Sequence, residues 1–255
     1  NIENSSYLLN EEPILVADYN GYFFDSLHCN IIANDVKGYK FDHWEVTYLD
    51  GKVEKVTSTE YDNEYYGGET LKAIYQKDEE YNPNKRSLFI NEICTSNSVY
   101  VDEFRETDDW IEIYNYGGKE DDLGGLYISN NRKNLTMYQI PTDQPETTTI
   151  PTDGFKIIWM DKDTLQGALH CNFKLNMGLE QSLYLSTKDK NNNISILDSV
   201  KIKLHRSNES YARFSYNDDG DWKITGWTTF GEKNQFGFHI DVPTLSADET
   251  TMTIY

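Results

Sequence analysis

Acidic side chains are the residues whose number and grouping in this chain could do chemistry. The 255 residues include 43 Asp and Glu against 23 Lys and Arg, which gives a formal net charge of −20. Loop carboxylates are ligands that calcium prefers. Calcium is therefore the ion that this chain is expected to favour, at a site that uses Asp109, Asp161 or Asp163. We expect no other cofactor.

Another acidic run is Asn217-Asp218-Asp219-Gly220-Asp221. Its composition is that of a calcium-binding loop, but its residues do not have the spacing of an EF-hand. An EF-hand loop needs Gly at its sixth position and Glu at its twelfth. Gly220 is out of place for this pattern, and Glu232 comes at the wrong distance. The run is therefore interpreted as a solvated turn with Asx hydrogen bonds.

His170 is the histidine placed best for a special role, within Leu169-His170-Cys171-Asn172-Phe173. A single histidine in a strand-rich segment is usually structural, with its ring nitrogens bonded to the backbone or to a carboxylate. Metal ligation and acid–base chemistry are the alternatives.

Motifs of the common enzymes are absent from the sequence. There is no Gly-x-Ser-x-Gly elbow, no His-Glu-x-x-His and no phosphate-binding glycine loop. This favours a non-catalytic protein. A glycan hydrolase that uses two opposed carboxylates stays the alternative, because the 43 acidic residues offer many pairs.

The charge and the apolar content limit the classes of partner. A strongly negative surface repels nucleic-acid phosphates and anionic lipid headgroups, so we expect neither nucleic acid nor membrane insertion. No run of about 18 apolar residues is present. The three cysteines are Cys29, Cys94 and Cys171, and their spacing indicates buried thiols. A Cys94–Cys171 disulfide is the other possibility.

The sequence of residues 1–84 predicts a small β domain that ends in a charged linker near Pro83. Asp50-Gly51 separates two strand-like runs and predicts a two-residue hairpin turn, with Tyr48 facing Val53. Phe41 and Trp44 are interpreted as core residues, and an exposed aromatic platform is the alternative.

The pattern Gly38-Tyr39-x-Phe41-x-x-Trp44, closed by Ala73-x-Tyr75, resembles divergent internalin-type B-repeats of bacterial surface proteins. The resemblance covers roughly residues 12–76.

Residues 87–237 alternate with the period of β-strands many times, with polar turns between the runs. In Asp109 to Tyr114, Ile111 and Ile113 point to one face, and Trp110 and Glu112 point to the other. Many short strands of this kind predict a sandwich.

A set of motifs in this segment resembles the lamin-tail domain in its bacterial form. The motifs are Ile90 to Ile93, Asp108 to Asn115, Gly124 to Ser129, Pro151 to Phe155, Leu169 to Leu175, Asp198 to Val200, Ser210 to Arg213 and Gly220 to Trp222. The resemblance implies an all-β fold, an immunoglobulin-like β-sandwich beside the small N-terminal β domain. It also implies placement outside the cell or on its surface, as part of a larger exported protein.

The function expected from these observations is binding or scaffolding without catalysis, by a monomer. Cell-envelope polysaccharide or a surface protein is the expected partner, and Trp227 and Tyr216 are the candidate ligand-binding residues. A purely structural spacer is a further alternative. Residues 238–255 are expected to form edge strands or to lead into another domain.

Overall fold

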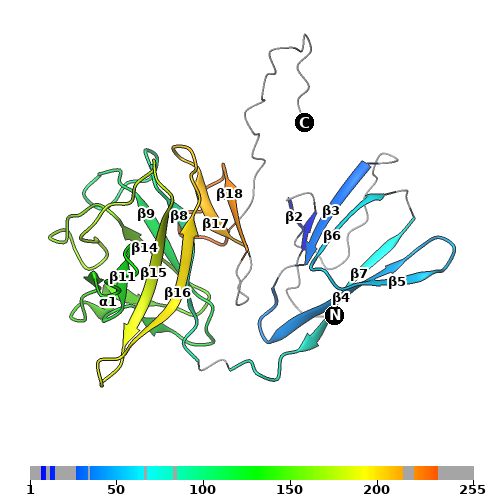
Figure 1. Cartoon of the computed structure of the whole chain (residues 1–255), viewed down its shortest axis with the longest axis horizontal. Coiled ribbons are helices and arrows are strands. Elements are labelled where there is room, and N and C mark those ends of the chain that lie inside the picture. The colour runs from blue at the N-terminus through cyan, green and yellow to red at the C-terminus, as the bar shows by residue number, and fades with distance from the viewer. Residues whose placement is uncertain are drawn as a thin grey trace, which may run out of the picture.

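The structure, a computed structural model, describes residues 7–9, 12–14, 27–33, 35–65, 68–82, 85–214 and 221–234. These residues form an almost entirely β architecture, with one group of sheets from the N-terminal third and a sandwich from the rest (Figure 1). The single described helix, α1 (Pro145–Thr148), is one turn long. The expected all-β class is confirmed.

The sandwich consists of two antiparallel sheets. One has the order β14-β9-β8-β17-β18, and the other has the order β12-β11-β15-β16. Their bounds are β8 Leu88–Cys94, β9 Trp110–Asn115, β11 Tyr127–Ser129, β12 Tyr138–Gln139, β14 Phe155–Trp159, β15 Gln181–Lys188, β16 Ile194–Ile202, β17 Ser210–Arg213 and β18 Trp222–Thr225. A short pair, β10 (Asp121–Asp122) with β13 (Thr149–Ile150), lies outside these sheets.

Alternation in β9 explains how the sandwich forms its core. Ile111 and Ile113 are fully buried and join the main apolar cluster, which also contains Ile158 from β14 and Leu183 from β15. The opposite face of β9 is buried as well, since Trp110 and Glu112 are both inaccessible. The five-stranded sheet is therefore covered on both faces, by the second sheet and by the segment that follows β18.

Two polar residues of the motifs act in the framework of the sandwich. Asn115 donates to the carbonyls of Lys119, Ile150 and Pro151 and ties two loops to the end of β9. Arg213 donates to Ile90 O and pairs with Asp198 of the facing sheet at 2.7 Å. These contacts explain why an amide and a guanidinium occupy buried positions.

The N-terminal strands form two sheets, ordered β2-β1-β3-β6 and β5-β4-β7. Their bounds are β1 Tyr7–Leu9, β2 Glu12–Ile14, β3 Leu27–Ala33, β4 Tyr39–Thr47, β5 Val53–Val56, β6 Glu60–Tyr65 and β7 Thr70–Lys77. Trp44 and Val46 are buried in the core between them, and Phe41 is packed against it. The expectation of a core role for the two aromatic residues of β4 is confirmed.

The expected two-residue hairpin turn is wrong by one residue. Thr47, and not Tyr48, pairs with Val53. Tyr48 N instead donates to Lys52 O, and the loop has three residues, Leu49 to Gly51. Gly51 has φ +82°, the left-handed position that such loops reserve for glycine.

Cys29, Cys94 and Cys171 are free thiols and are buried, as the first interpretation expected. No described helix is long and apolar enough to cross a membrane. The expected edge strands in residues 238–255 lie outside the described residues.

Candidate functional site: a pocket beside a buried histidine

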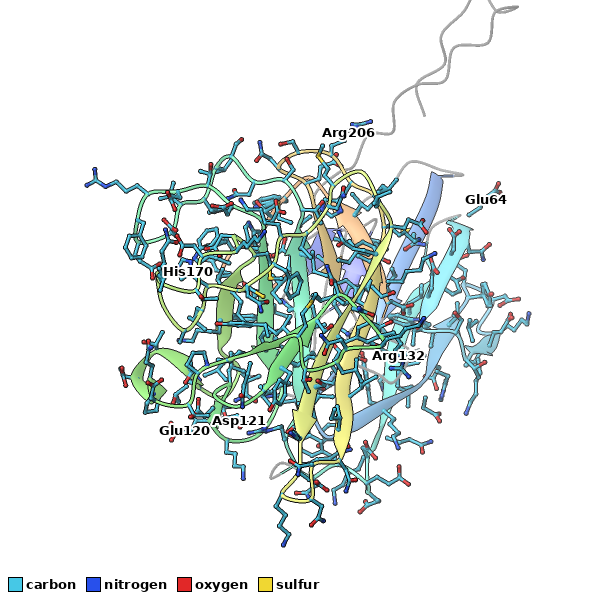
Figure 2. The ribbon with its side chains drawn as sticks, turned by 60° about the vertical axis from the view of Figure 1, so that its left-hand side comes forward. Glu64, Glu120, Asp121, Arg132, His170 and Arg206 are labelled. Carbon is cyan, nitrogen blue, oxygen red and sulfur yellow. The ribbon has the colours of Figure 1, made fainter. Side chains whose placement is uncertain are left out.

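Two loops at one end of the five-stranded sheet position the candidate site. Residues 95–109 connect β8 to β9, and residues 160–175 follow β14. The second loop folds back along β14, because Trp159 N donates to Leu169 O and Cys171 N donates to Trp159 O. His170 therefore lies next to β14, among loops on the side away from the N-terminal strands (Figure 2).

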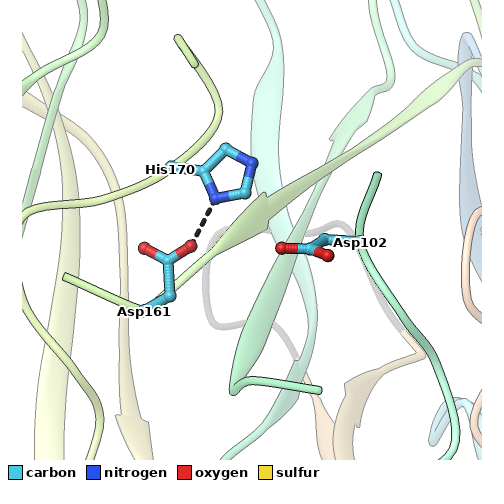
Figure 3. A group of neighbouring side chains, drawn as sticks. All are labelled: Asp102, Asp161 and His170. Atoms are coloured by element: carbon cyan, nitrogen blue, oxygen red, sulfur yellow. Dashed lines mark hydrogen bonds and ion pairs between the residues drawn. The ribbon is translucent and has the colours of Figure 1, made fainter. Parts of the chain in front are cut away.

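Asp102, Asp161 and His170 meet where the two loops come together (Figure 3). All three are buried, and their ligand-type atoms lie within 4.8 Å of one another. His170 Nδ1 bonds to Asp161 Oδ2. His170 Nε2 lies 3.3 Å from Glu103 Oε1, on the solvent side of the cluster.

Each Asp also holds its own loop in place. Asp102 Oδ1 accepts the amides of Phe104 and Glu106, both at 2.8 Å. Asp161 Oδ1 accepts the amide of Asp163 at 2.9 Å. The carboxylates are thus fixed by local turns that leave their second oxygens for the cluster.

The surroundings of His170 act on its pKa in opposite directions. Burial disfavours the charged imidazolium, but the hydrogen bonds and charges of Asp161 and Glu103 outweigh burial and raise the pKa of His170. The imidazole therefore holds a proton more strongly than a free histidine does.

A pocket of about 460 Å³ adjoins this cluster. Asp102 and Glu103 line it on one side, and Gln166 to Leu169 form a further part of its wall. Trp159 and Phe230 contribute aromatic surface, and the remaining lining includes Gln144, Thr147, Lys156 and Ile157. Burial lowers the pKa of the Lys156 ammonium. The pocket thus combines aromatic rings with several polar side chains.

Residues 226–234, here called the C-terminal strap, complete the pocket by contributing Phe230. The Phe230 ring stacks on Tyr100 with centroids 4.4 Å apart. It also contacts Trp110 and Trp159, with centroids at 5.2 and 5.6 Å. This aromatic cluster anchors the strap on the outer face of the five-stranded sheet.

Two buried carboxylates under the strap provide its second anchor. Glu92 accepts the hydroxyls of Ser210 and Thr229 and the Thr229 amide. Glu112 accepts Asn91 Nδ2 at 2.6 Å and the Gly231 amide at 2.7 Å. Burial raises the pKa of Glu112 to about 8 and also raises that of Glu92.

The candidate calcium residues do not form one group. Asp161 joins His170 and Asp102 instead of Asp109 and Asp163. Asp163 is exposed, whereas burial raises the pKa of Asp109 to about 7. The calcium site built from these three residues stays a prediction.

Of the two candidate ligand-binding aromatic residues, only Trp227 belongs to the part of the chain that the structure describes. Trp227 is 56% exposed and belongs to the strap, but it does not line the pocket. Tyr216 lies outside the described residues, as does most of the 217–221 run.

Asp102, Glu103, Lys156 and Phe230 were not anticipated as site residues. Asp102 comes 59 positions before Asp161 in the chain, so only the path of the two loops brings them together. The signals in the sequence were Asp161, as a candidate calcium ligand, and His170, whose ring nitrogens were expected to bond to the backbone or to a carboxylate. The observed bond between His170 and Asp161 is the second of those two arrangements.

The chain was compared with known families, curated proteins and solved structures. The lamin tail domain family matches residues 82–218. A solved structure of a DUF4876 family protein from Bacteroides thetaiotaomicron is similar at 11% identity, covering 99% of this chain and 96% of that chain, with a TM-score of 0.32. No curated protein matches. The B-repeat resemblance and the domain boundaries stay predictions. Since the family match spans more than half of the chain, the protein belongs to the lamin tail domain family.

Proposed function

We propose that the protein is a non-catalytic binding module that takes a carbohydrate in the pocket beside His170, within a larger protein exported by a bacterium. The observation that carries the proposal is the lining of the pocket, where aromatic rings adjoin amide and charged side chains. Sugars are recognised by this combination, because rings contact their apolar faces and polar groups bond to their hydroxyls.

The size of the pocket supports a short glycan segment or a chain end. Its volume of about 460 Å³ lies within the range of about 300–1,000 Å³ that is usual for small-ligand sites. Gln166 adds a specific feature, since its buried Oε1 has no hydrogen-bond partner among the described residues. A ligand hydroxyl would supply the missing donor.

The surroundings of Glu92 and Glu112 favour a structural role for these two carboxylates over a catalytic one. Glu92 and Glu112 lie under the strap, where protein donors occupy them. A glycosidase needs two carboxyl groups on opposite sides of an accessible bond. Glu92 and Glu112 therefore have a structural role in this proposal.

The test is retention of the purified chain on immobilised cell-wall and mucin-type polysaccharides, with and without calcium. Gln144→Ala and Lys156→Met alter the pocket lining, and Trp227→Ala is the matched change outside it. We expect saturable retention on one polysaccharide, weakened by both pocket substitutions and unchanged by Trp227→Ala. Retention lost only with Trp227→Ala would move the site to the exposed face of the strap. No retention on any polysaccharide would contradict carbohydrate binding and favour a spacer.

A further inference from the structure

We infer that Asp102, Asp161 and His170 form a binding site for a divalent transition-metal ion, with Zn²⁺ or Mn²⁺ as its occupant and Glu103 as an additional ligand. The inference does not depend on what the pocket binds. It rests on the donor set, the spacing of the donors, the charge of the cluster and its position beside the pocket.

The donor set consists of two buried carboxylates and one buried imidazole. Imidazole nitrogen suits zinc, iron, copper and nickel, whereas calcium prefers a cage of oxygen ligands. Carboxylates complete the coordination of zinc and manganese in many proteins. The presence of His170 therefore moves the expected occupant from calcium to a transition metal.

The spacing of the donors fits a single ion after side-chain rotation. Their ligand atoms lie within 4.8 Å of one another. Bonds of about 2.0–2.2 Å to a tetrahedral zinc ion place two ligand atoms roughly 3.3–3.6 Å apart. Side-chain movement of about an ångström closes this difference, while the Oδ1 atoms of Asp102 and Asp161 keep accepting the amides of their loops.

The charge of the cluster points to a missing cation. Asp102 and Asp161 are both buried, and Glu103 stands at the rim with a side chain that is 61% exposed. Among the described residues, no Lys or Arg forms an ion pair with any of these three carboxylates. A single imidazolium balances only one of the two buried charges, and buried charges without a partner are costly.

The pocket gives an ion a route to the cluster. Asp102 and Glu103 belong to its lining, so an ion entering the pocket meets these carboxylates before it reaches His170. A bound ion would join the 95–109 loop to the 160–175 loop. The loops are already linked without the ion, by the Lys174–Asp108 ion pair at 2.7 Å, by the bond from Met160 N to Asp109 O at 2.8 Å and by the Gln166–Glu106 hydrogen bond at 2.6 Å.

The test is titration of the chelator-treated chain with Zn²⁺, Mn²⁺, Ca²⁺ and Mg²⁺ in a calorimeter, with bound metal measured after dialysis. We expect one Zn²⁺ or Mn²⁺ per chain. His170→Gln and Asp102→Asn should weaken binding by more than the roughly 10–100-fold that loss of an outer partner costs. Glu103→Gln should weaken it less, because this carboxylate lies at the exposed rim.

His43→Gln is the matched control. His43 is also buried and also bonded through Nδ1 to an Asp, Asp42, but it lies in the N-terminal sheets and belongs to no three-ligand group among the described residues. Its substitution should leave metal binding unchanged. Circular dichroism of each variant checks folding, and Asp102→Asn with Glu103→Gln carries the test if His170→Gln does not fold.

Three results would overturn the inference. One is the absence of stoichiometric Zn²⁺ or Mn²⁺ binding, and another is binding that survives the substitutions in folded chains. The third is calcium binding as strong as zinc binding, which would contradict the role given to the imidazole.

Discussion

Glu92 with Glu112, and Asp102 with Asp161, are two pairs of buried carboxylates whose surroundings differ. The first pair accepts hydrogen bonds from hydroxyl, amide and backbone donors and lies under the strap. In the second pair Asp161 is bonded to His170, Asp102 lies within 4.8 Å of them, and the group adjoins a pocket. Carboxylates that are covered by a strap and filled by protein donors indicate a structural role, whereas carboxylates grouped with an imidazole beside a cavity indicate a place for a ligand.

The strap makes the first pair part of the fold. Asn234 Nδ2 donates to Asn91 O and Arg213 O, so the end of the strap is bonded to both β8 and β17. The family match ends at residue 218, yet the motif residues Glu92 and Glu112 bind a segment beyond it. In this chain the two motif carboxylates hold the strap in place.

The largest expected effect comes from removing Glu92. Glu92→Ala leaves the Ser210 and Thr229 hydroxyls and the Thr229 amide without their acceptor, so we expect a loss of about 3 kcal/mol or more in the free energy of unfolding. Urea unfolding measures this loss. Glu180→Ala removes an exposed ion pair with Lys201 that solvent screens, so it should cost far less than Glu92→Ala. Equal losses of unfolding free energy in the two variants would contradict the structural role given to Glu92.

The next effect is a loss of stability as the pH rises. Burial raises the pKa of Glu112 from 4.5 to about 8, so the folded chain binds this proton more tightly than the unfolded chain. The associated stability is fully present below the unfolded pKa and is lost as the pH rises through the folded one. We expect the free energy of unfolding to fall by a few kcal/mol between about pH 5 and pH 8.

Glu112→Gln tests the origin of this pH dependence. The substitution removes the titrating group, so the slope should flatten, while the loss of one of the two acceptor oxygens lowers stability at acid pH, where Glu112 holds its proton. Urea unfolding across the pH range gives both quantities. An unchanged slope in the variant would assign the dependence to other groups.

A smaller and more local effect is expected at the second pair. His170→Gln in metal-free protein removes the bond to Asp161 and should cost about 1–3 kcal/mol. Hydrogen exchange should quicken at the amides of Glu106 and Asp163, which are bonded to the two Asp side chains. Equal quickening throughout the sandwich core would show that this cluster is as central to the fold as Glu92.

The smallest effect is expected at the rim of the pocket. Glu103 is 61% exposed, so Glu103→Gln should change the free energy of unfolding by less than about 1 kcal/mol. Thermal unfolding of the metal-free chain checks this value. A larger loss would mean that the rim carboxylate supports the fold and would weaken its assignment as a ligand.

Much of the sandwich could be predicted from sequence because β9 and its partners alternate with period two. Ile111 and Ile113 lie in the core as expected, and Lys201 and Lys203 are exposed. The burial of Glu112 could not be derived from alternation, because alternation assigns a face without saying what covers it. The covering strap comes from residues more than 110 positions later in the chain.

Hairpin register and the candidate site show where local sequence gives insufficient information. Asp50-Gly51 fits either a two-residue or a three-residue loop, and the observed pairing of Thr47 with Val53 selects the longer one. Asp161 and His170 were singled out from the sequence and lie in one loop, but Asp102 joins them only through the crossing of a second loop. Loop crossings depend on tertiary packing that no short pattern encodes.

Equilibrium binding of a polysaccharide panel to the wild-type chain, Gln144→Ala and Trp227→Ala tests the central claim most directly. The account predicts saturable binding of one polysaccharide that weakens with Gln144→Ala and persists with Trp227→Ala, because only Gln144 lines the pocket. Binding that is absent from the whole panel, or that is unaffected by the pocket substitution, would contradict the claim that the pocket beside His170 is the functional site.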